Sequence, residues 1–200
     1  MADTYFKASD HNVKLVDLGS DRYSQAVSIE NAEFDTVTDA LVVMEVEHHE
    51  IHEGDFYEVP NIINITNGNT YAISILTNAT KQVHFKTEKL ASSGEKISIG
   101  LQEGVTIAGG SAVIPINHNR TSTKTSSVVV KTGVTLSTAG TTVSVGYIGG
   151  GTGVGGNSNG GDSSVSNEYI LKTSTNYGVV IVNNGVGAST VLTSLQWYEE

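Results

Sequence analysis

The sequence predicts an all-β protein, a β-sandwich or jelly roll of about ten strands with an extended N-terminal arm. Thr, Ser, Val, Ile, Asn and Gly dominate the 200 residues, and only 16% are charged, against roughly a quarter in an average domain. Short alternating segments recur at roughly 8–15-residue spacing with turn-forming residues between them. No segment carries a sustained helical stripe with a cap, which disfavours a helical bundle or a doubly wound α/β enzyme.

The expected strands are short runs rich in β-branched residues. In chain order they lie at residues 40–48, 56–65, 71–76, 81–89, 96–101, 127–131, 141–148, 167–173, 177–183 and 190–198. Residues 40–48 are apolar at first and then alternate with acidic positions. In residues 96–101, Ile97, Ile99 and Leu101 recur with a period of two, so we expect them on one face.

Two local signals refine the strand pattern. Pro60 cannot donate to a ladder, so it limits the strand at 56–65 to a sheet edge or a bulge. The turn formers at 67–70, with Gly68 after Asn67, predict a β-hairpin between residues 62–65 and 71–76.

The chain divides into an arm and a β domain. Residues 1–22 mix charged and polar side chains without alternation, so we interpret them as an extended acidic arm and residues 23–200 as the β-sandwich domain. Residues 149–161 hold eight Gly in thirteen positions, which predicts an exposed, flexible loop. A dinucleotide-binding fingerprint also occurs there by letter, but turn formers rather than a helix follow it, so we interpret the match as accidental.

Charge is unevenly distributed along the chain. Residues 1–58 hold 14 acidic and 3 basic side chains, a net charge of −11, whereas residues 59–200 hold 7 and 8, a net charge of +1. An acidic segment repels phosphate, so we expect no nucleic-acid binding. The segment is either a solvated surface or one that meets a basic surface on a partner. The absence of Cys excludes disulfides and thiolate metal sites.

His48, His49 and His52 form the most pointed cluster, with five acidic residues inside positions 45–55. Imidazoles and carboxylates bind divalent transition metals, and on a strand His48 and His52 share a face while His49 points away. The cluster is similar to the His-x-His…Glu set of the cupins, but its spacing differs and no later Gly-rich strand supplies a fourth ligand. The alternative is a strand end and polar turn whose charges protect a sheet edge. We therefore assign no metal and no cofactor, and keep these histidines as metal candidates.

No residue stands out as catalytic. A nucleophile elbow is absent, His84 and His118 are isolated in the sequence, and Trp197 in the last strand is expected to pack in the core. Neither is there an apolar run near the roughly 20 residues that span a bilayer, so we expect no membrane partner. We expect a protein that is not an enzyme.

Three segments resemble a group of tailed-bacteriophage virion proteins. They are residues 46–57 (VEHHEIHEGDFY), residues 100–106 with 114–122 (GLQEGVT and IPINHNRTS), and residues 195–200 (LQWYEE). Members of this group are similar to capsid decoration, or cement, proteins, which are β-sandwich subunits on the outside of the head and are commonly trimers. The resemblance covers most of residues 40–200 and transfers no catalytic residues.

This resemblance implies a decoration protein that binds the major capsid protein and itself, as a homotrimer, and stabilises the capsid lattice. The expected location is the capsid exterior of the virion. The absence of a signal-peptide pattern implies synthesis in the bacterial cytoplasm. Tyr5 and Phe6 are the expected contacts of the arm with a neighbouring subunit. Two other functions remain open: a receptor- or glycan-binding tail or fibre component with the loop at 149–161 as its tip, and a cupin-like metal enzyme.

Overall fold

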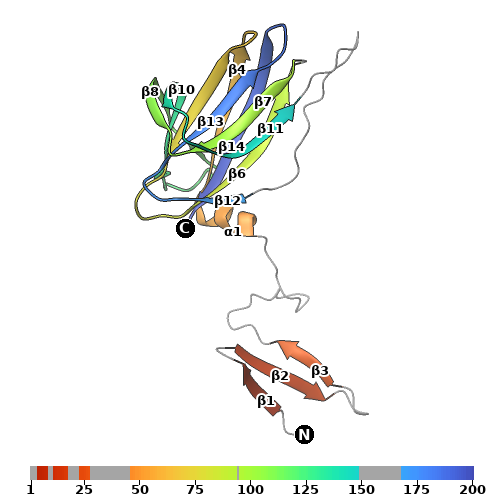
Figure 1. The fold of residues 1–200 in the computed structure, drawn as a ribbon. Helices are drawn as coiled ribbons and strands as arrows, with labels where there is room; N and C mark the ends of the chain where they lie inside the picture. The colour runs from red at the N-terminus through yellow and green to blue at the C-terminus, as the bar shows by residue number, and fades with distance from the viewer. Residues whose placement is uncertain (1–3, 9–10, 18–22, 28–45, 94, 149–167) are drawn as a thin grey trace. The chain divides into compact units, whose positions relative to one another are not determined.

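The computed structural model describes residues 4–8, 11–17, 23–27, 46–93, 95–148 and 168–200. Figure 1 shows that almost all of the regular structure is β, with one short helix. The chain forms two compact units, Met1–Glu45 and Val46–Glu200. The expected all-β fold is therefore confirmed, and the loop predicted at residues 149–161 lies outside the described residues.

The first unit contains a three-stranded antiparallel sheet rather than an extended arm. Its strands, in the spatial order β1-β2-β3, are β1 (Thr4–Ala8), β2 (His11–Asp17) and β3 (Tyr23–Val27). The expected division after residue 22 differs from the observed one, because β3 pairs with β2 and the second unit begins at Val46. Antiparallel backbone hydrogen bonds join these strands even though their side chains lack a sustained alternation.

The second unit is a β-sandwich of two antiparallel sheets. The six-stranded sheet has the order β11-β7-β13-β5-β10-β8, with β5 (Thr70–Leu76), β7 (Ile97–Glu103), β8 (Thr106–Val113), β10 (Val129–Thr138), β11 (Thr141–Ile148) and β13 (Asn176–Asn183). The five-stranded sheet has the order β12-β6-β14-β4-β9, with β4 (Phe56–Ile65), β6 (Val83–Ser92), β9 (Ile116–Asn117), β12 (Glu168–Leu171) and β14 (Ser189–Glu199).

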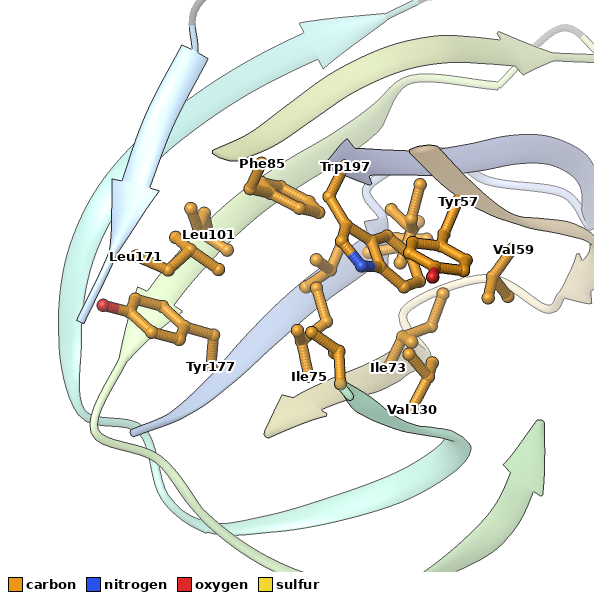
Figure 2. Close-up of a cluster of buried hydrophobic side chains, with 14 of the residues drawn as sticks. Tyr57, Val59, Ile73, Ile75, Phe85, Leu101, Val130, Leu171, Tyr177 and Trp197 are labelled. Carbon is orange, nitrogen blue, oxygen red and sulfur yellow. The ribbon is translucent and has the colours of Figure 1, made fainter. Parts of the chain in front are cut away.

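The core lies between the two sheets, as Figure 2 shows. Trp197 and Tyr57 from the five-stranded sheet stack with ring centroids 6.2 Å apart, and Ile73 and Ile75 of β5 lie in the same cluster. Trp197 is fully buried, so its expected packing role is confirmed. Burying a large apolar side chain adds about 1.5–3 kcal/mol to the free energy of unfolding. The inner faces of the two sheets are therefore the main source of stability.

Glu199 is a carboxylate buried at the end of this core, only 2% exposed. It accepts hydrogen bonds from Ser126 Oγ at 2.5 Å, from Ser127 N at 3.1 Å and from Trp197 Nε1 at 3.1 Å, and also from Ser127 Oγ. A buried carboxylate is tolerated when donors satisfy its oxygens. Glu199 therefore attaches the segment that precedes β10 to the last strand.

One predicted strand is wrong. Residues 46–48 belong to a helix, α1 (Val46–Glu53), while residues 40–45 lie outside the described residues. Gly54, with φ of +79°, ends the helix: its N–H donates to Ile51 O at 3.1 Å, and the N–H of Asp55 donates to Glu50 O at 2.9 Å. These two bonds form a Schellman motif, which favours glycine because the position after the helix is left-handed. The alternation of acidic residues masked this stop signal in the sequence.

The predicted hairpin at residues 67–70 is also wrong, although a turn is present. Gly68 has φ of +71° and Asn69 N donates to Thr66 O at 3.1 Å. The strands on either side belong to different sheets, because β4 pairs with β14 whereas β5 pairs with β10 and β13. A turn signal reports only that the chain reverses, and here the reversal carries it from one layer of the sandwich to the other.

Pro60 lies within β4 opposite Ser194 of β14. On the other side of β4, β9 pairs only with Tyr57 and Glu58, so no described strand faces Pro60 there. The expectation of an open edge at Pro60 is confirmed at that position. Ile97 and Leu101 are buried in the core with Ile99 packed against it, which confirms the face predicted for this strand. The strands β8 and β9 were not predicted, because the Gly pair of β8 and the shortness of β9 weaken alternation.

Candidate functional site

The outer face of the five-stranded sheet carries polar side chains in a row across four strands. Strand pairing aligns Glu58 of β4 with Gln196 of β14, Gln196 with Lys86 of β6, and Lys86 with Glu168 of β12. Because directly opposed residues of antiparallel strands project from the same face, these four side chains form one line. We call this line the polar row. Lys86 is 9% exposed and Gln196 is 5% exposed, so the centre of the row is shielded from water.

Glu58, at one end of the polar row, is held by hydrogen bonds from both sides. Ser194 Oγ donates to its Oε1, and Nε2 of His118 lies 2.8 Å from its Oε2. Burial alone would raise the pKa of Glu58, but the bonds from Ser194 and His118 outweigh it and hold this pKa below its usual value. The ionised carboxylate is therefore the form that this surface stabilises.

Glu168, at the other end of the polar row, makes a similar set of bonds. Its Oε1 lies 2.6 Å from Nδ1 of His84 and accepts a 2.9 Å bond from the hydroxyl of Tyr198. The Tyr198 ring stacks on His84 with centroids 4.3 Å apart. Burial alone would raise the pKa of Glu168, but these two partners lower it. Burial first, then the bond to Glu168, raises the pKa of Tyr198, so its hydroxyl remains a donor.

Polar contacts, rather than an apolar face of the helix, attach the short helix α1 to the polar row and to Asn119. Lys86 Nζ donates to Glu47 Oε2 at 2.5 Å, and Asn119 Nδ2 donates to the carbonyl of His52 at 2.9 Å. None of the helix residues is fully buried. Just after the helix, Asp55 accepts bonds from Lys124 at 2.6 Å and Lys81 at 3.4 Å. Together these contacts fix the helix at the end of the sandwich where Figure 1 places the C-terminus.

The three histidines of the predicted cluster lie on α1, not on a strand. His48 and His52 are exposed and near each other, with their Nε2 atoms 2.9 Å apart and ring centroids 4.7 Å apart. His49 is separate, with its Nδ1 3.3 Å from Glu50. Within the described ranges, no group of three or more His, Cys, Asp or Glu side chains is arranged to hold a metal ion. The structure thus brings together two of the three candidates and places them on a helix, unlike strand-borne cupin ligands.

The outer face of the six-stranded sheet differs in chemistry. Val145 and Tyr147 of β11 are 65% and 64% exposed. Val145 lies opposite Gly100 of β7, and Tyr147 lies opposite Ser98. Continuing across the sheet, Gly100 and Ser98 pair with Val180 and Val182, and these pair with Ala72 and Thr70. We call these two lines of small or uncharged side chains the uncharged rows.

The strand β11 is also a sheet edge. It is the outermost strand beside β7, so its second side has no partner strand in the described part of the chain. None of its eight residues is charged. Natural edge strands usually carry charges, Pro or bulges that prevent association. This one has a register shift between Thr142 and Ser144 but keeps Val143, Val145 and Tyr147 exposed.

The other residues singled out in the sequence lie on β1 and beside the polar row. Tyr5 and Phe6 lie on β1, where they pair in register with Lys14 and Val13 of β2. His84 and His118, which are isolated in the sequence, lie beside Glu168 and Glu58 at the two ends of the polar row. The sequence did not predict the polar row, because its members come from strands far apart in the chain. The position of Glu58 between the buried Tyr57 and Val59 is a local signal of it.

Comparisons with known proteins returned no relatives. No family model matches the chain, and neither the curated proteins nor the solved structures contain a match. Among the described residues, no helix has the length and apolar character required to cross a membrane.

Proposed function

We propose that this chain is a capsid decoration protein that binds the outer surface of a tailed-phage head and stabilises the capsid lattice. In this proposal the protein is not an enzyme; it is a homotrimer that contacts the major capsid protein on the virion exterior. The support comes from the segments that resemble phage virion proteins and from the β-sandwich fold. The resemblance includes residues 46–57, which contain α1 and the start of β4.

The observation that carries the proposal is the exposed pair Val145 and Tyr147 at the β11 side of the six-stranded sheet. Val145 and Tyr147 project from strand β11, which has no charged side chain and a free edge among described strands. Association surfaces bury apolar and aromatic groups of this kind. Each contact in a symmetric oligomer is repeated, so several modest interfaces add up to strong attachment to a lattice.

The two-unit organisation also suits attachment to several capsid subunits. The first unit, Met1–Glu45, holds 9 acidic and 3 basic side chains, whereas the β-sandwich provides the uncharged rows. An acidic unit favours a basic surface on its partner, and the exposed apolar side chains of the uncharged rows favour an apolar one. The chain therefore offers two chemically different contacts, and a lattice that separates must break both.

The test is binding to purified capsids that lack the protein. Wild-type chain should co-sediment with the capsids to saturation and raise their temperature of disruption. The double variant V145D/Y147D should bind at least tenfold more weakly, because it places charges in the uncharged rows. The matched control is the double variant I62D/I170D, which puts the same two charges at strand positions that are 70% and 62% exposed on the other sheet. That variant should bind as the wild type does.

The proposal fails if the wild-type chain does not bind capsids and leaves their heat resistance unchanged. Binding to host glycans without capsid binding would instead favour the receptor-binding tail or fibre component. Circular dichroism of each variant establishes that a loss of binding is not a loss of folding. All of these substitutions lie at exposed strand positions, where changes in the free energy of unfolding are typically within about 1 kcal/mol.

A further inference from the structure

The side chains of His48 and His52 form a pair that is separate from the contacts of the polar row. They lie one helical turn apart on α1, and both side chains are exposed. Their Nε2 atoms face each other at 2.9 Å. Residues four apart on a helix lie on the same side, so the helix itself holds the two rings together. His49, between them in sequence, is directed to Glu50 instead.

The distance between the two Nε2 atoms matches the distance between two nitrogen ligands on one metal ion. Two nitrogens that each lie about 2.0–2.1 Å from a metal and at right angles to each other are about 2.9 Å apart, and about 3.3 Å apart at a tetrahedral angle. The observed separation of 2.9 Å needs no change for the first geometry and about 0.4 Å for the second. Histidines at this spacing on a helix face are an established ligand pair for transition metals.

We propose that His48 and His52 form a two-histidine chelate for a late first-row divalent cation: Ni²⁺, Cu²⁺ or Zn²⁺. Imidazole nitrogen suits these ions, whereas Mg²⁺ and Ca²⁺ prefer oxygen ligands. Because the described residues supply no group of three ligands, water molecules complete the coordination. In the free protein one Nε2 carries the proton of the shared hydrogen bond. On binding, that ring becomes the Nδ1–H tautomer, which leaves both Nε2 lone pairs to the metal.

The consequence of binding is a cross-link between consecutive turns of α1. This helix has only eight residues and buries none of them fully, so it depends on the Glu47–Lys86 and His52–Asn119 bonds for its place. Short helices are marginal without such supports. A chelated ion adds a support that acts only on the helical form, so the metal stabilises α1 by mass action. The chelate does not depend on capsid attachment.

Calorimetric titration of the full, tag-free chain with NiCl₂ at pH 7.5 tests the site. We expect one equivalent of Ni²⁺ to bind, with the same site taking Zn²⁺ but not Mg²⁺. Substituting either member of the pair, H48A or H52A, should weaken binding at least tenfold. The control H49A removes a neighbouring imidazole outside the pair, and it should change the affinity by less than twofold. All three positions are exposed, so folding is expected to be unaffected.

A second measurement identifies the atoms. In ¹H–¹⁵N spectra of the histidine rings, addition of Zn²⁺ should shift the Nε2 signals of His48 and His52 and leave His49 and His118 unchanged. The proposal is overturned if H49A loses binding as much as H48A does, or if H48A/H52A binds Ni²⁺ as tightly as the wild type. It is also overturned if Zn²⁺ shifts other ring nitrogens and not this pair.

Discussion

The two sheets of the sandwich have similar inner faces but opposite outer faces. Inside, both contribute buried aliphatic and aromatic side chains to one core. Outside, the five-stranded sheet carries the polar row, in which Lys86 and Gln196 are almost fully shielded and Glu58 and Glu168 are hydrogen-bonded. The six-stranded sheet carries the uncharged rows, where Val145 and Tyr147 remain about two-thirds exposed. The contrast is greatest at the α1 end, since Ile62 and Leu192 are exposed farther along the five-stranded sheet.

This difference indicates that the outer faces of the two sheets have different roles. The polar row is completed within the chain, because α1 and the segment around His118 supply its partners. Satisfied polar networks stabilise a structure and specify one arrangement, but they leave little for a binding partner to gain. The uncharged rows have few such bonds and so remain available for association.

Removing a lysine charge should lower the free energy of unfolding more at the polar row than beside the uncharged rows. Lys86→Met takes away the almost fully buried cation that lies 2.5 Å from Glu47 and near Glu168, so Glu47 loses its bond to Nζ and Glu168 keeps only His84 and Tyr198 as partners. We expect a loss of about 1–2 kcal/mol in the free energy of unfolding, measured by urea denaturation, because water partly screens the exposed carboxylates. Lys96→Met is the matched change beside the uncharged rows, where Lys96 Nζ lies 4.6 Å from the centre of the Tyr147 ring. There we expect about 0.5 kcal/mol.

Equal losses for the two lysine variants would contradict the contrast between the faces. So would a gain in stability for Lys86→Met, because it would mean that the cost of burying the lysine exceeds its attraction to the carboxylates.

Acid should weaken the protein through the polar row. The pKa values of Glu58 and Glu168 are lowered from 4.5 in the folded chain, so the unfolded chain binds more protons as the pH falls. The stabilisation from these carboxylates is therefore complete above pH 4.5 and is lost as the pH falls through their folded pKa values. Urea midpoints should be nearly constant from about pH 7 to 5.5 and decrease below about pH 4.5.

The variant E58Q/E168Q should show a shallower decrease in the urea midpoint below pH 4.5. Some decrease should remain, because the bonds from Lys172 and Tyr177 also lower the pKa of Glu103. Glu53→Gln, an exposed change on α1, serves as the control and should follow the wild-type curve. A double variant that follows the same curve would show that the polar row does not set the acid response.

Removing the first unit should have the smallest effect on the sandwich. The chain divides at Glu45, so a variant that begins at Val46 keeps both sheets and α1. We expect its thermal unfolding midpoint to lie within about 4 °C of that of the full chain, since a change of 1 kcal/mol moves a domain of this size by about that much. Its capsid binding should nevertheless weaken, because one of two contacts is gone. An unfolded variant by circular dichroism would contradict the division into units.

Several features followed from local patterns in the sequence. The β-branched runs predicted nine of the strands, eight of them to within about three residues, because alternation reports directly which side of a sheet is buried. The strand predicted at 127–131 is longer than expected, since β10 extends to Thr138. His48 and His52 were expected to share a face, and they do, although for a different reason. Positions four apart coincide on a strand, where the period is two, and nearly coincide on a helix, where it is 3.6. The helix was missed because its stop signal, Gly54, follows a run that also alternates.

Composition and alternation by themselves determined that this is a β protein, that Trp197 packs inside and that residue 60 faces an open edge, because each is a property of a residue and its near neighbours. Tertiary structure alone decided which strands pair. The polar row joins Glu58, Lys86, Glu168 and Gln196, which are up to 138 positions apart, and its members meet only through the registers of β14 with β4 and β6 and of β6 with β12. Register is chosen by the packing of whole faces, so no local stretch of sequence contains it.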